Sequence, residues 1–521
     1  MAIRSYREAV KSHRHRILRW IGVWLGSALL CGGALAVPKL GTGPDALRQL
    51  VRCPQVDLQI AFGVDLARGF VVNDPERPRT EIAAARAVLK ASPDNAHEWL
   101  RLGTWLPATG DTNGTAAALN KAIALYQSRV ERTASDDEAQ AELAEALKLA
   151  GRAPEAERRL RSALEANPSA WRSRLALAQI LDAQWLTGSS SSAKAEKPAK
   201  QAEAGKLVDR AVELAPNEPT AYRARGFHRF AVAQDGLADS APSGKREPGS
   251  VPAQAAVEDY WRSATLWKTN VLSWGIAGFT ELVARVGPEA SEGVDFGTLP
   301  ADSQQRIVGA LRALESLASE DAGPTAALAL EMRGILQFLT GSRAASEATL
   351  KRAVKLDPSR FQAWEVLLAV HLRSEDRDGL RETCAARAKV RPTGRNFLMY
   401  AKSLERAGRL DDALETAEAG VEVEPENLWL RMTVVSLKLK TSTDAASLEG
   451  VADQLREIAT RIDRLPKNQE WIRMARHFVP TVCLFQALSG NLEEARRMLG
   501  EWMKNNPTDT WSKEISEALG T

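Results

Sequence analysis

Residues 137–170 constrain the fold of this chain more than any other stretch, because they read as two amphipathic helices in succession. Each helix carries an apolar stripe at helical spacing, formed by Leu143, Ala144 and Leu147 in the first and by Ala156, Leu160, Ala163 and Leu164 in the second. Gly151 ends the first helix, since glycine accepts the left-handed backbone found there. Pro154 opens the second, where its missing N–H has no partner to lose. The pattern predicts an antiparallel helix pair that ends at Pro168.

Small residues stand where two such helices cross most closely. Ala144, Ala156 and Ala163 are positions 8, 20 and 27 of the stretch, and Pro168 is position 32. This pattern resembles the tetratricopeptide repeat (TPR), although Gln140 replaces the usual aromatic residue at position 4. The resemblance implies an all-α, TPR-like α-solenoid of antiparallel helix pairs, in which each pair packs on its neighbours.

The same register recurs along much of residues 80–521. Trp99 and Gly103 fall at positions 4 and 8 of one unit, and the prolines Pro358, Pro392 and Pro425 are 34 and 33 residues apart. Extra residues at 188–200 and 236–253 are expected to loop into solvent between the two helices of a pair. Residues 271–320 keep helical periodicity without the repeat residues, and helices are expected over 271–286 and 301–319.

The predicted organisation has eight parts. They are a basic tail (1–19), a transmembrane helix (20–37), a linker or capping segment (38–79), a TPR-like array with the insertion 188–200 (80–235), a flexible insertion (236–253), degenerate helical repeats (254–326), a second TPR-like array (327–507) and a C-terminal capping helix (508–521). Within the capping segment, short helices are expected over 44–51 and 56–67.

Residues 20–37 form an uncharged run of 18 residues. As a helix it is roughly 27 Å long, close to the thickness of a bilayer core. Six basic residues and one acidic residue precede it, which favours a cytoplasmic N-terminus and an extracytoplasmic repeat body. The alternative is a cleaved signal peptide, since Ala34-Leu35-Ala36 fits a cleavage site near Ala36 and would release a periplasmic or secreted solenoid.

Charge and cysteine content exclude several classes of protein. The whole chain carries +3, and residues 1–19 carry +5, so the remainder is nearly neutral and offers no basic stripe for nucleic acid. No Cys-x-x-Cys occurs, which argues against a zinc ribbon or a thioredoxin-type redox motif. Cys384 and Cys483 fall in small apolar slots of their repeats, so packing is the expected role of both.

The sequence contains no pattern typical of catalysis. Nucleotide-binding glycine loops, H-E-x-x-H and G-x-S-x-G are all absent. His97, His228, His371 and His477 stand on separate repeats without metal-ligand spacing, so neither a metal nor a cofactor is expected. Acidic pairs such as Asp136-Asp137 are expected to cap helices.

A TPR resemblance implies binding in a concave groove lined by the first helix of each pair, helix A, near positions 2, 5, 9 and 12. In the clearest units these positions predict a partner-binding set of His97, Leu100, Thr104, Glu138, Glu145, Arg172, Gln179, Arg223, Phe227 and Phe230. The set mixes charges with apolar residues, which favours a protein or peptide partner.

The sequence therefore predicts a membrane-tethered, non-catalytic interaction scaffold, and its partner is expected in an envelope-associated complex. An accessory subunit that presents substrate to a separate enzyme is the alternative from another class.

Overall fold

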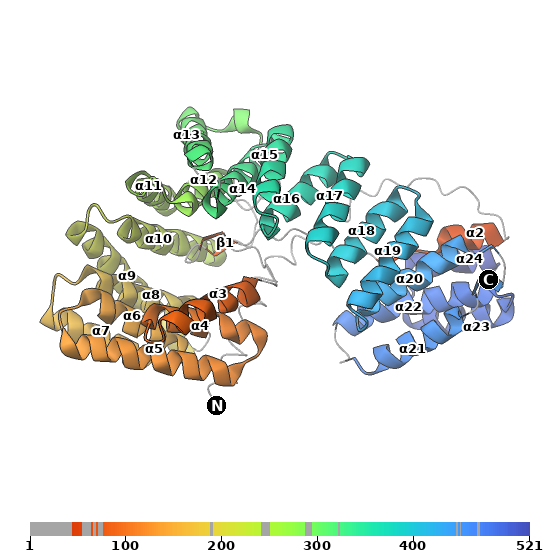
Figure 1. Cartoon of the computed structure of the whole chain (residues 1–521), viewed down its shortest axis with the longest axis horizontal. Coiled ribbons are helices and arrows are strands. Elements are labelled where there is room, and N and C mark those ends of the chain that lie inside the picture. The colour runs from red at the N-terminus through yellow and green to blue at the C-terminus, as the bar shows by residue number, and fades with distance from the viewer. Residues whose placement is uncertain are drawn as a thin grey trace. The chain divides into compact units, whose positions relative to one another are not determined.

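The computed structural model describes residues 44–54, 64–65, 69–70, 77–187, 191–240, 251–286, 294–320, 323–443, 446–448, 450–465 and 469–520. These residues form two compact units, each built of helices packed in pairs (Figure 1). In the described part, the first unit lies within residues 64–357, and the second combines residues 44–54 with residues 358–520.

The first unit holds thirteen long helices among its described residues, together with short 3-10 turns and one pair of strands. The helices are α3 (Arg77–Ala91), α4 (Ala96–Trp105), α5 (Thr112–Arg132), α6 (Asp137–Leu149), α7 (Ala153–Ala166), α8 (Trp171–Thr187), α9 (Ser191–Leu214), α10 (Pro219–Ser240), α11 (Val251–Leu266), α12 (Val271–Val286), α13 (Ala301–Glu320), α14 (Pro324–Leu339) and α15 (Arg343–Leu356). The 3-10 turns are η1 (Leu106–Thr109) and η3 (Phe296–Thr298), and the strands are β1 (Val64–Asp65) and β2 (Gly69–Phe70).

The second unit begins with a short helix that lies far from the others in the sequence. Its elements are α2 (Pro44–Leu50), α16 (Phe361–Arg373), α17 (Arg377–Val390), α18 (Gly394–Arg406), α19 (Leu410–Val423), α20 (Leu428–Thr441), η4 (Ala446–Leu448), α21 (Val451–Asp463), α22 (Gln469–Leu488), α23 (Leu492–Asn505) and α24 (Thr510–Leu519).

The helix pair predicted over residues 137–170 is confirmed as α6 and α7. The Asp136 side chain caps α6 by accepting a hydrogen bond from the Ala139 N–H at 2.9 Å. Gly151 follows the helix with a φ of 78°, the left-handed backbone that an L side chain rarely adopts. Pro154 lies in the first turn of α7, where it displaces no hydrogen bond.

One hydrogen bond recurs where a turn leads into helix A. A side chain near the start of the helix donates to a backbone carbonyl six residues earlier, which ties the helix to the turn before it. The donors are Trp99, Gln140, Arg174, Tyr222, Trp274, Trp364 and Arg431.

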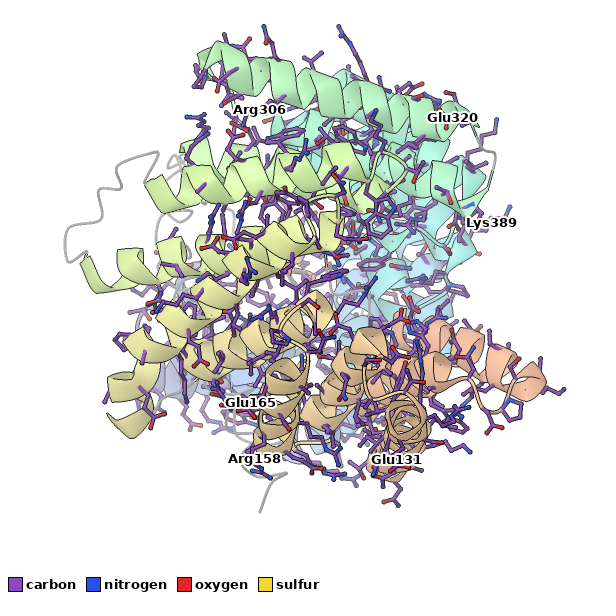
Figure 2. The ribbon with its side chains drawn as sticks, turned by 90° about the vertical axis from the view of Figure 1, so that its left-hand side faces the viewer. Glu131, Arg158, Glu165, Arg306, Glu320 and Lys389 are labelled. Atoms are coloured by element: carbon purple, nitrogen blue, oxygen red, sulfur yellow. The ribbon has the colours of Figure 1, made fainter. Side chains whose placement is uncertain are left out.

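The core of each unit is a set of leucines and small residues from both helices of the pairs. In the first unit, Leu143, Ala144, Leu147, Ala156 and Leu160 are buried together with residues of the neighbouring pairs. Outward faces carry charge instead, as the exposed Arg158 and Glu165 on α7 illustrate in Figure 2. This division explains why the apolar stripes of residues 137–170 predict the pair correctly.

Periodicity also predicts the helices of the degenerate region. Those expected over 271–286 and 301–319 are confirmed as α12 and α13. The buried cysteines Cys384 and Cys483 agree with the packing role expected for both.

Three local expectations are wrong. Residues 236–240 and 251–253 of the predicted insertion 236–253 belong to α10 and α11 rather than to a loop. Residues 191–200 do not loop out, because they form the first turns of α9, a segment rich in the helix formers Ala, Lys and Glu. There Lys197 pairs with Asp235 at 2.5 Å. The helix expected over 56–67 is contradicted at Val64 and Asp65, which pair with Phe70 and Gly69 and so use their backbone groups between strands.

The predicted transmembrane helix, residues 20–37, lies outside the described residues, as do residues 241–250 of the predicted flexible insertion. Among the helices that the structure describes, none combines the length and apolar character needed to cross a bilayer.

Candidate partner-binding surface

Four helices of the first unit occupy the helix A place of successive repeats and carry the predicted partner-binding set. They are α4, α6, α8 and α10, and α6 packs against both α4 and α8. The Asp137 carboxylate on α6 accepts hydrogen bonds from the N–H groups of Arg172 (2.7 Å) and Ser173 (2.8 Å) at the start of α8. One repeat thereby caps the helix A of the next, which fixes the spacing of the two helices.

Three of the predicted residues use their side chains for contacts within the protein. Leu100 and Phe230 are only 6% and 8% exposed, so their side chains belong to the core and offer almost no surface to a partner. The Thr104 hydroxyl is half-buried and donates to the Leu100 carbonyl of its own helix at 2.9 Å. The repeat register places these positions on helix A but does not reveal how deeply each side chain is covered.

An acidic stripe lies on one face of α6. Glu138, Glu142 and Glu145 follow one another at i, i+4 and i+7, and these spacings bring side chains together on one side of a helix. Glu138 is paired with Arg129 at 2.8 Å, and Glu145 is paired with Lys148. Glu142, in the middle, makes no hydrogen bond or ion pair within the described part of the chain.

Glu142 is held in an unfavourable electrostatic environment. Burial raises the pKa of its carboxyl, and the like charges of Glu145 and Glu138 raise it further, whereas the nearby His97 on α4 lowers it. The structure thus brings the predicted residues His97, Glu138 and Glu145 together around a residue that the predicted set omits. The i, i+4 spacing from Glu138 is the sequence signal that could have identified Glu142.

On α8 the surface is basic and polar instead of acidic. The Arg172 guanidinium lies over the ring of Trp171, 4.1 Å from the ring centre, and the Gln179 side chain is exposed. A cation stacked on an aromatic face keeps its charge available along its edge while its position is fixed. This part of the predicted set therefore offers a positioned positive charge beside an exposed amide.

On α10 the predicted residues Arg223 and Phe227 are half-buried, whereas Phe230 is buried in the core. Phe227 keeps part of its ring exposed. Burial lowers the pKa of the Arg223 guanidinium, against the influence of the buried Tyr260 on α11. The surface along α4, α6, α8 and α10 therefore runs from acidic, through basic and polar, to partly apolar.

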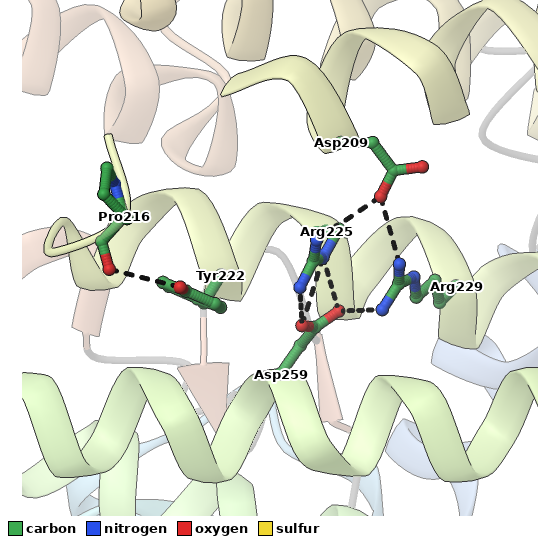
Figure 3. A network of polar contacts seen from close by, with 6 residues as sticks. All are labelled: Asp209, Pro216, Tyr222, Arg225, Arg229 and Asp259. Atoms are coloured by element: carbon green, nitrogen blue, oxygen red, sulfur yellow. Dashed lines mark hydrogen bonds and ion pairs between the residues drawn. The ribbon is translucent and has the colours of Figure 1, made fainter. Parts of the chain in front are cut away.

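A network of ion pairs holds α10 between the two neighbouring helices (Figure 3). Asp259 of α11 lies between Arg225 (2.6 Å) and Arg229 (2.9 Å), and Arg229 also reaches Asp209 of α9 at 3.0 Å. Burial raises the pKa of the Asp259 carboxyl, in opposition to the two arginines. The network fixes the rotation of α10, and with it the direction in which Phe227 points.

A second buried polar cluster in this unit involves His228. Its Nδ1 atom lies 2.8 Å from the Asp182 carboxylate, which also accepts a hydrogen bond from Trp185 Nε1 at 2.8 Å. Sequence spacing gives His228 no carboxylate companion, because Asp182 lies 46 residues away on α8. The cluster joins α8 to α10 through the core, which is a packing role.

No protein-family model matches the chain, and no curated protein matches it. Among solved structures, yeast Tom70 is similar at 12% identity and a TM-score of 0.30, over 85% of this chain and 91% of that one. PilF of Pseudomonas aeruginosa is similar at 12% identity and 0.28, over 50% and 96%. The TPR protein TTC0263 of Thermus thermophilus is similar at 18% identity and 0.21, over 47% and 94%.

At these TM-scores the likenesses carry no argument about function. The fold is TPR-like because its helix pairs, its small residues at the crossings and its turn prolines follow the repeat register.

Proposed function

We propose that this chain is a non-catalytic scaffold that binds a segment of another protein along α4, α6, α8 and α10 of the first unit. The observation that carries the proposal is Glu142, a half-buried carboxylate between two other acids that makes no hydrogen bond or ion pair within the described residues, although His97 and Arg129 lie near enough to lower its pKa. A surface helix rarely keeps such an arrangement for stability, since like charges at these spacings oppose one another.

The surface also indicates the chemistry of the partner. A lysine or arginine placed over Glu142 would relieve the repulsion around it and gain a charge-assisted hydrogen bond in a partly desolvated site. An acidic or amide group would suit Arg172 and Gln179, and an apolar side chain would suit Phe227. The proposed ligand is therefore a peptide segment of mixed character, with its basic residue over α6 and its apolar residue over α10.

Photo-crosslinking in cells tests the location of this surface. A photoreactive amino acid at Gln179 or Phe227 is expected to capture a protein partner, which mass spectrometry then identifies. The control position is Arg158, exposed on the outward face of α7. Equal capture of the same protein from Arg158 would contradict the proposal.

The substitution Glu142→Lys then tests the residue that carries the proposal. It is expected to weaken binding of the captured partner at least tenfold, because it replaces an attraction with a repulsion inside a partly buried site. Glu165→Lys, the same charge change on the outward face of α7, is the matched control and is expected to leave the affinity within twofold. Isothermal titration calorimetry measures the affinity of each variant for the partner, and equal affinities would contradict the proposal.

We further propose that residues 20–37 tether the scaffold to a membrane, with the repeats on the extracytoplasmic side in an envelope-associated complex. The uncharged run and the basic residues before it support this topology. A topology reporter fused after Thr521 is expected to be active only outside the cytoplasm. N-terminal sequencing of the mature protein distinguishes an anchor from a signal peptide cleaved near Ala36.

A further inference from the structure

Residues 44–54 lie in the second unit although they precede its repeats by about 300 residues. They form the two-turn helix α2 followed by four residues without regular structure. The helix packs on α20, α22 and α24, and Cys53 continues the contact to α18. Three of these helices, α18, α20 and α22, are the helix A elements of successive repeats, and α24 is the terminal helix that follows them. Helix A elements also carry the predicted binding positions in the first unit.

The segment inserts apolar side chains between these helices. Leu47, Leu50 and Val51 join one core cluster with residues of α20, α22 and α24. Cys53 joins a second cluster with Ala401 and Leu404 of α18 and with residues of α19 and α20. Val51 is 1% exposed and Cys53 is 3% exposed.

The polar contacts are those by which a groove holds a peptide. Trp511 Nε1 donates to the Leu50 carbonyl at 2.7 Å, and Lys402 Nζ donates to the Cys53 carbonyl at 3.2 Å. These two bonds recognise backbone, whereas the ion pair between Arg52 and Glu514 at 2.6 Å recognises a side chain. Backbone contacts fix a peptide in place, and side-chain pockets select its sequence.

The residues that hold the segment also occupy the binding positions of the repeat. The repeat register begins at Gly394 for α18, at Arg476 within α22 and at Thr510 for α24. Counted from these residues, the positions are 9 and 12 for Lys402 and Glu405, 2 for His477, and 2 and 5 for Trp511 and Glu514. Glu405 lies beside the Cys53 thiol, and His477 lies beside the backbone of Arg52. Positions 2, 5, 9 and 12 are those predicted to line the groove, so the segment lies where a partner would bind.

We propose that the helix A surface of the second unit is a peptide-binding groove, and that residues 44–54 of the same chain are its resident ligand. The groove selects a short amphipathic helix with leucines three residues apart, followed by an extended Val-Arg-Cys stretch. An outside segment of this pattern enters only by displacing residues 44–54. This groove is separate from the surface on α4, α6, α8 and α10, and the proposal does not depend on the function proposed for that surface.

The first experiment uses the full chain, purified in detergent, with a protease recognition sequence inserted after Gln55. The protein folds intact, and cleavage then makes the segment a non-covalent ligand. A fluorescein-labelled peptide of residues 43–55 is expected to exchange into the groove after cleavage, and to bind the uncleaved chain at least tenfold more weakly. The same peptide carrying Leu50→Asp is expected to compete at least tenfold less well, because a carboxylate would enter an apolar pocket.

Three results of this experiment would overturn the proposal. They are a labelled peptide that fails to bind the cleaved protein, a Leu50→Asp peptide that competes as well as the unchanged one, and a complex of twice the expected mass. The last would mean that the segment binds a second copy of the chain. Fluorescence anisotropy measures the first two, and light scattering measures the third.

The second experiment follows the Cys53 thiol in the uncleaved chain, in a Cys31→Ser background. Leu50→Asp is expected to speed maleimide labelling of Cys53 at least tenfold, while Cys384 and Cys483 stay protected. Asp45→Asn, on the exposed side of α2, is the matched control and should leave Cys53 protected. Continued protection of Cys53 in Leu50→Asp contradicts the proposal. Exposure of all three thiols also contradicts it, since the segment would then be an inseparable part of the core.

Discussion

At the scale of single residues, one side-chain donor at position 4 of helix A holds the turn before several of these helices, by bonding a backbone carbonyl six residues earlier. Trp99, Tyr222 and Trp364 supply it with aromatic side chains, and Gln140 supplies it with an amide that reaches the Ala134 carbonyl at 3.4 Å. The departure from the repeat pattern at Gln140 therefore keeps the bond and loses only the ring. At position 4 a donor is more common among these helices than an aromatic residue, although Phe397 of α18 has no such group.

The small residues at helix crossings give a prediction about stability. A Cβ atom added at Gly334 of α14 would lie 2.5 Å from Leu350 Cγ, so Gly334→Val is expected to destabilise the first unit by about 1–3 kcal/mol. Gly309→Ala on the exposed face of α13 meets no atom within 4 Å, and is expected to stabilise the same unit by about 0.5–1 kcal/mol. Differential scanning calorimetry measures both, and shifts of the same sign would contradict the packing argument.

Sequence reasoning succeeds with single residues when their partners lie within one helix pair. It predicts Ala144, Ala156 and Gly151 from the spacing alone, because the repeat fixes which of them meet. It does not predict that Asp182 meets His228, since 46 residues and an insertion separate them. The depth at which Leu100 and Phe230 lie is also missed, because burial depends on neighbouring repeats.

At the scale of helices, hydrophobic periodicity predicts α6, α7, α12 and α13 well, even where the repeat residues are absent. It fails where the composition suggests a linker but the residues form a helix. The residues at 191–200 resemble a linker in their serine, lysine and proline content, yet their alanines and charges suit a helix equally well. The packing of Lys197 against Trp185 and Asp235, which decides the outcome, is invisible in the sequence.

The ion-pair network around α10 predicts an asymmetric effect of two similar substitutions. Asp259→Asn leaves Arg225 and Arg229 without their shared buried carboxylate, and is expected to destabilise the first unit by about 3–5 kcal/mol. Asp209→Asn, whose side chain is half exposed, is expected to change stability by less than about 1 kcal/mol. Thermal unfolding followed by circular dichroism compares them, and equal effects would show that the buried pairing is unimportant.

The packing of α22 on α24 predicts that the second unit is weakened by acid. His477 lies 5.0 Å from Trp511 between ring centres, and its Nε2 atom is buried without a hydrogen-bond partner. Burial lowers its pKa to about 4, and the nearby charges of Lys402 and Arg52 lower it further, whereas Glu405 raises it. The unfolded chain therefore binds a proton that the folded unit excludes between pH 6.5 and 4.

Stability of the second unit should accordingly be complete above pH 6.5 and fall by up to about 3 kcal/mol as the pH drops towards 4. The substitution His477→Gln removes the titrating group and is expected to flatten this part of the profile. Melting temperatures at pH 7.5 and pH 5 provide the measurement. A variant that retains the full slope would assign the acid sensitivity to other groups.

At the scale of the whole molecule, the chain has two units with separate cores. The clusters around Leu143 and Ile82 belong to the first unit, and those around Leu484, Ala401 and Leu380 belong to the second. We expect calorimetry to resolve two unfolding transitions, of which Gly334→Val shifts one and Leu50→Asp shifts the other. A single transition moved by both variants would contradict two independent cores.

The return of residues 44–54 to the second unit could not be predicted from the sequence. The sequence predicts a short helix over 44–51, observed at 44–50, but eleven residues without a repeat pattern give no indication of where they pack. Their contacts lie up to 461 residues away, and only the folded arrangement brings them together.

That separation also sets a delay during synthesis. Leu50 leaves the ribosome 461 residues before Trp511, which at roughly 5–20 residues per second is a gap of about 20–90 s. Throughout it the pocket of Leu47, Leu50 and Val51 is incomplete, because α24 does not yet exist, and the Cys53 thiol has no site until α20 has been made. The newborn chain thus presents an uncovered apolar segment and an open thiol that the finished protein conceals. A nascent chain stopped before α24 should bind chaperones through this segment, and release them once α24 is made.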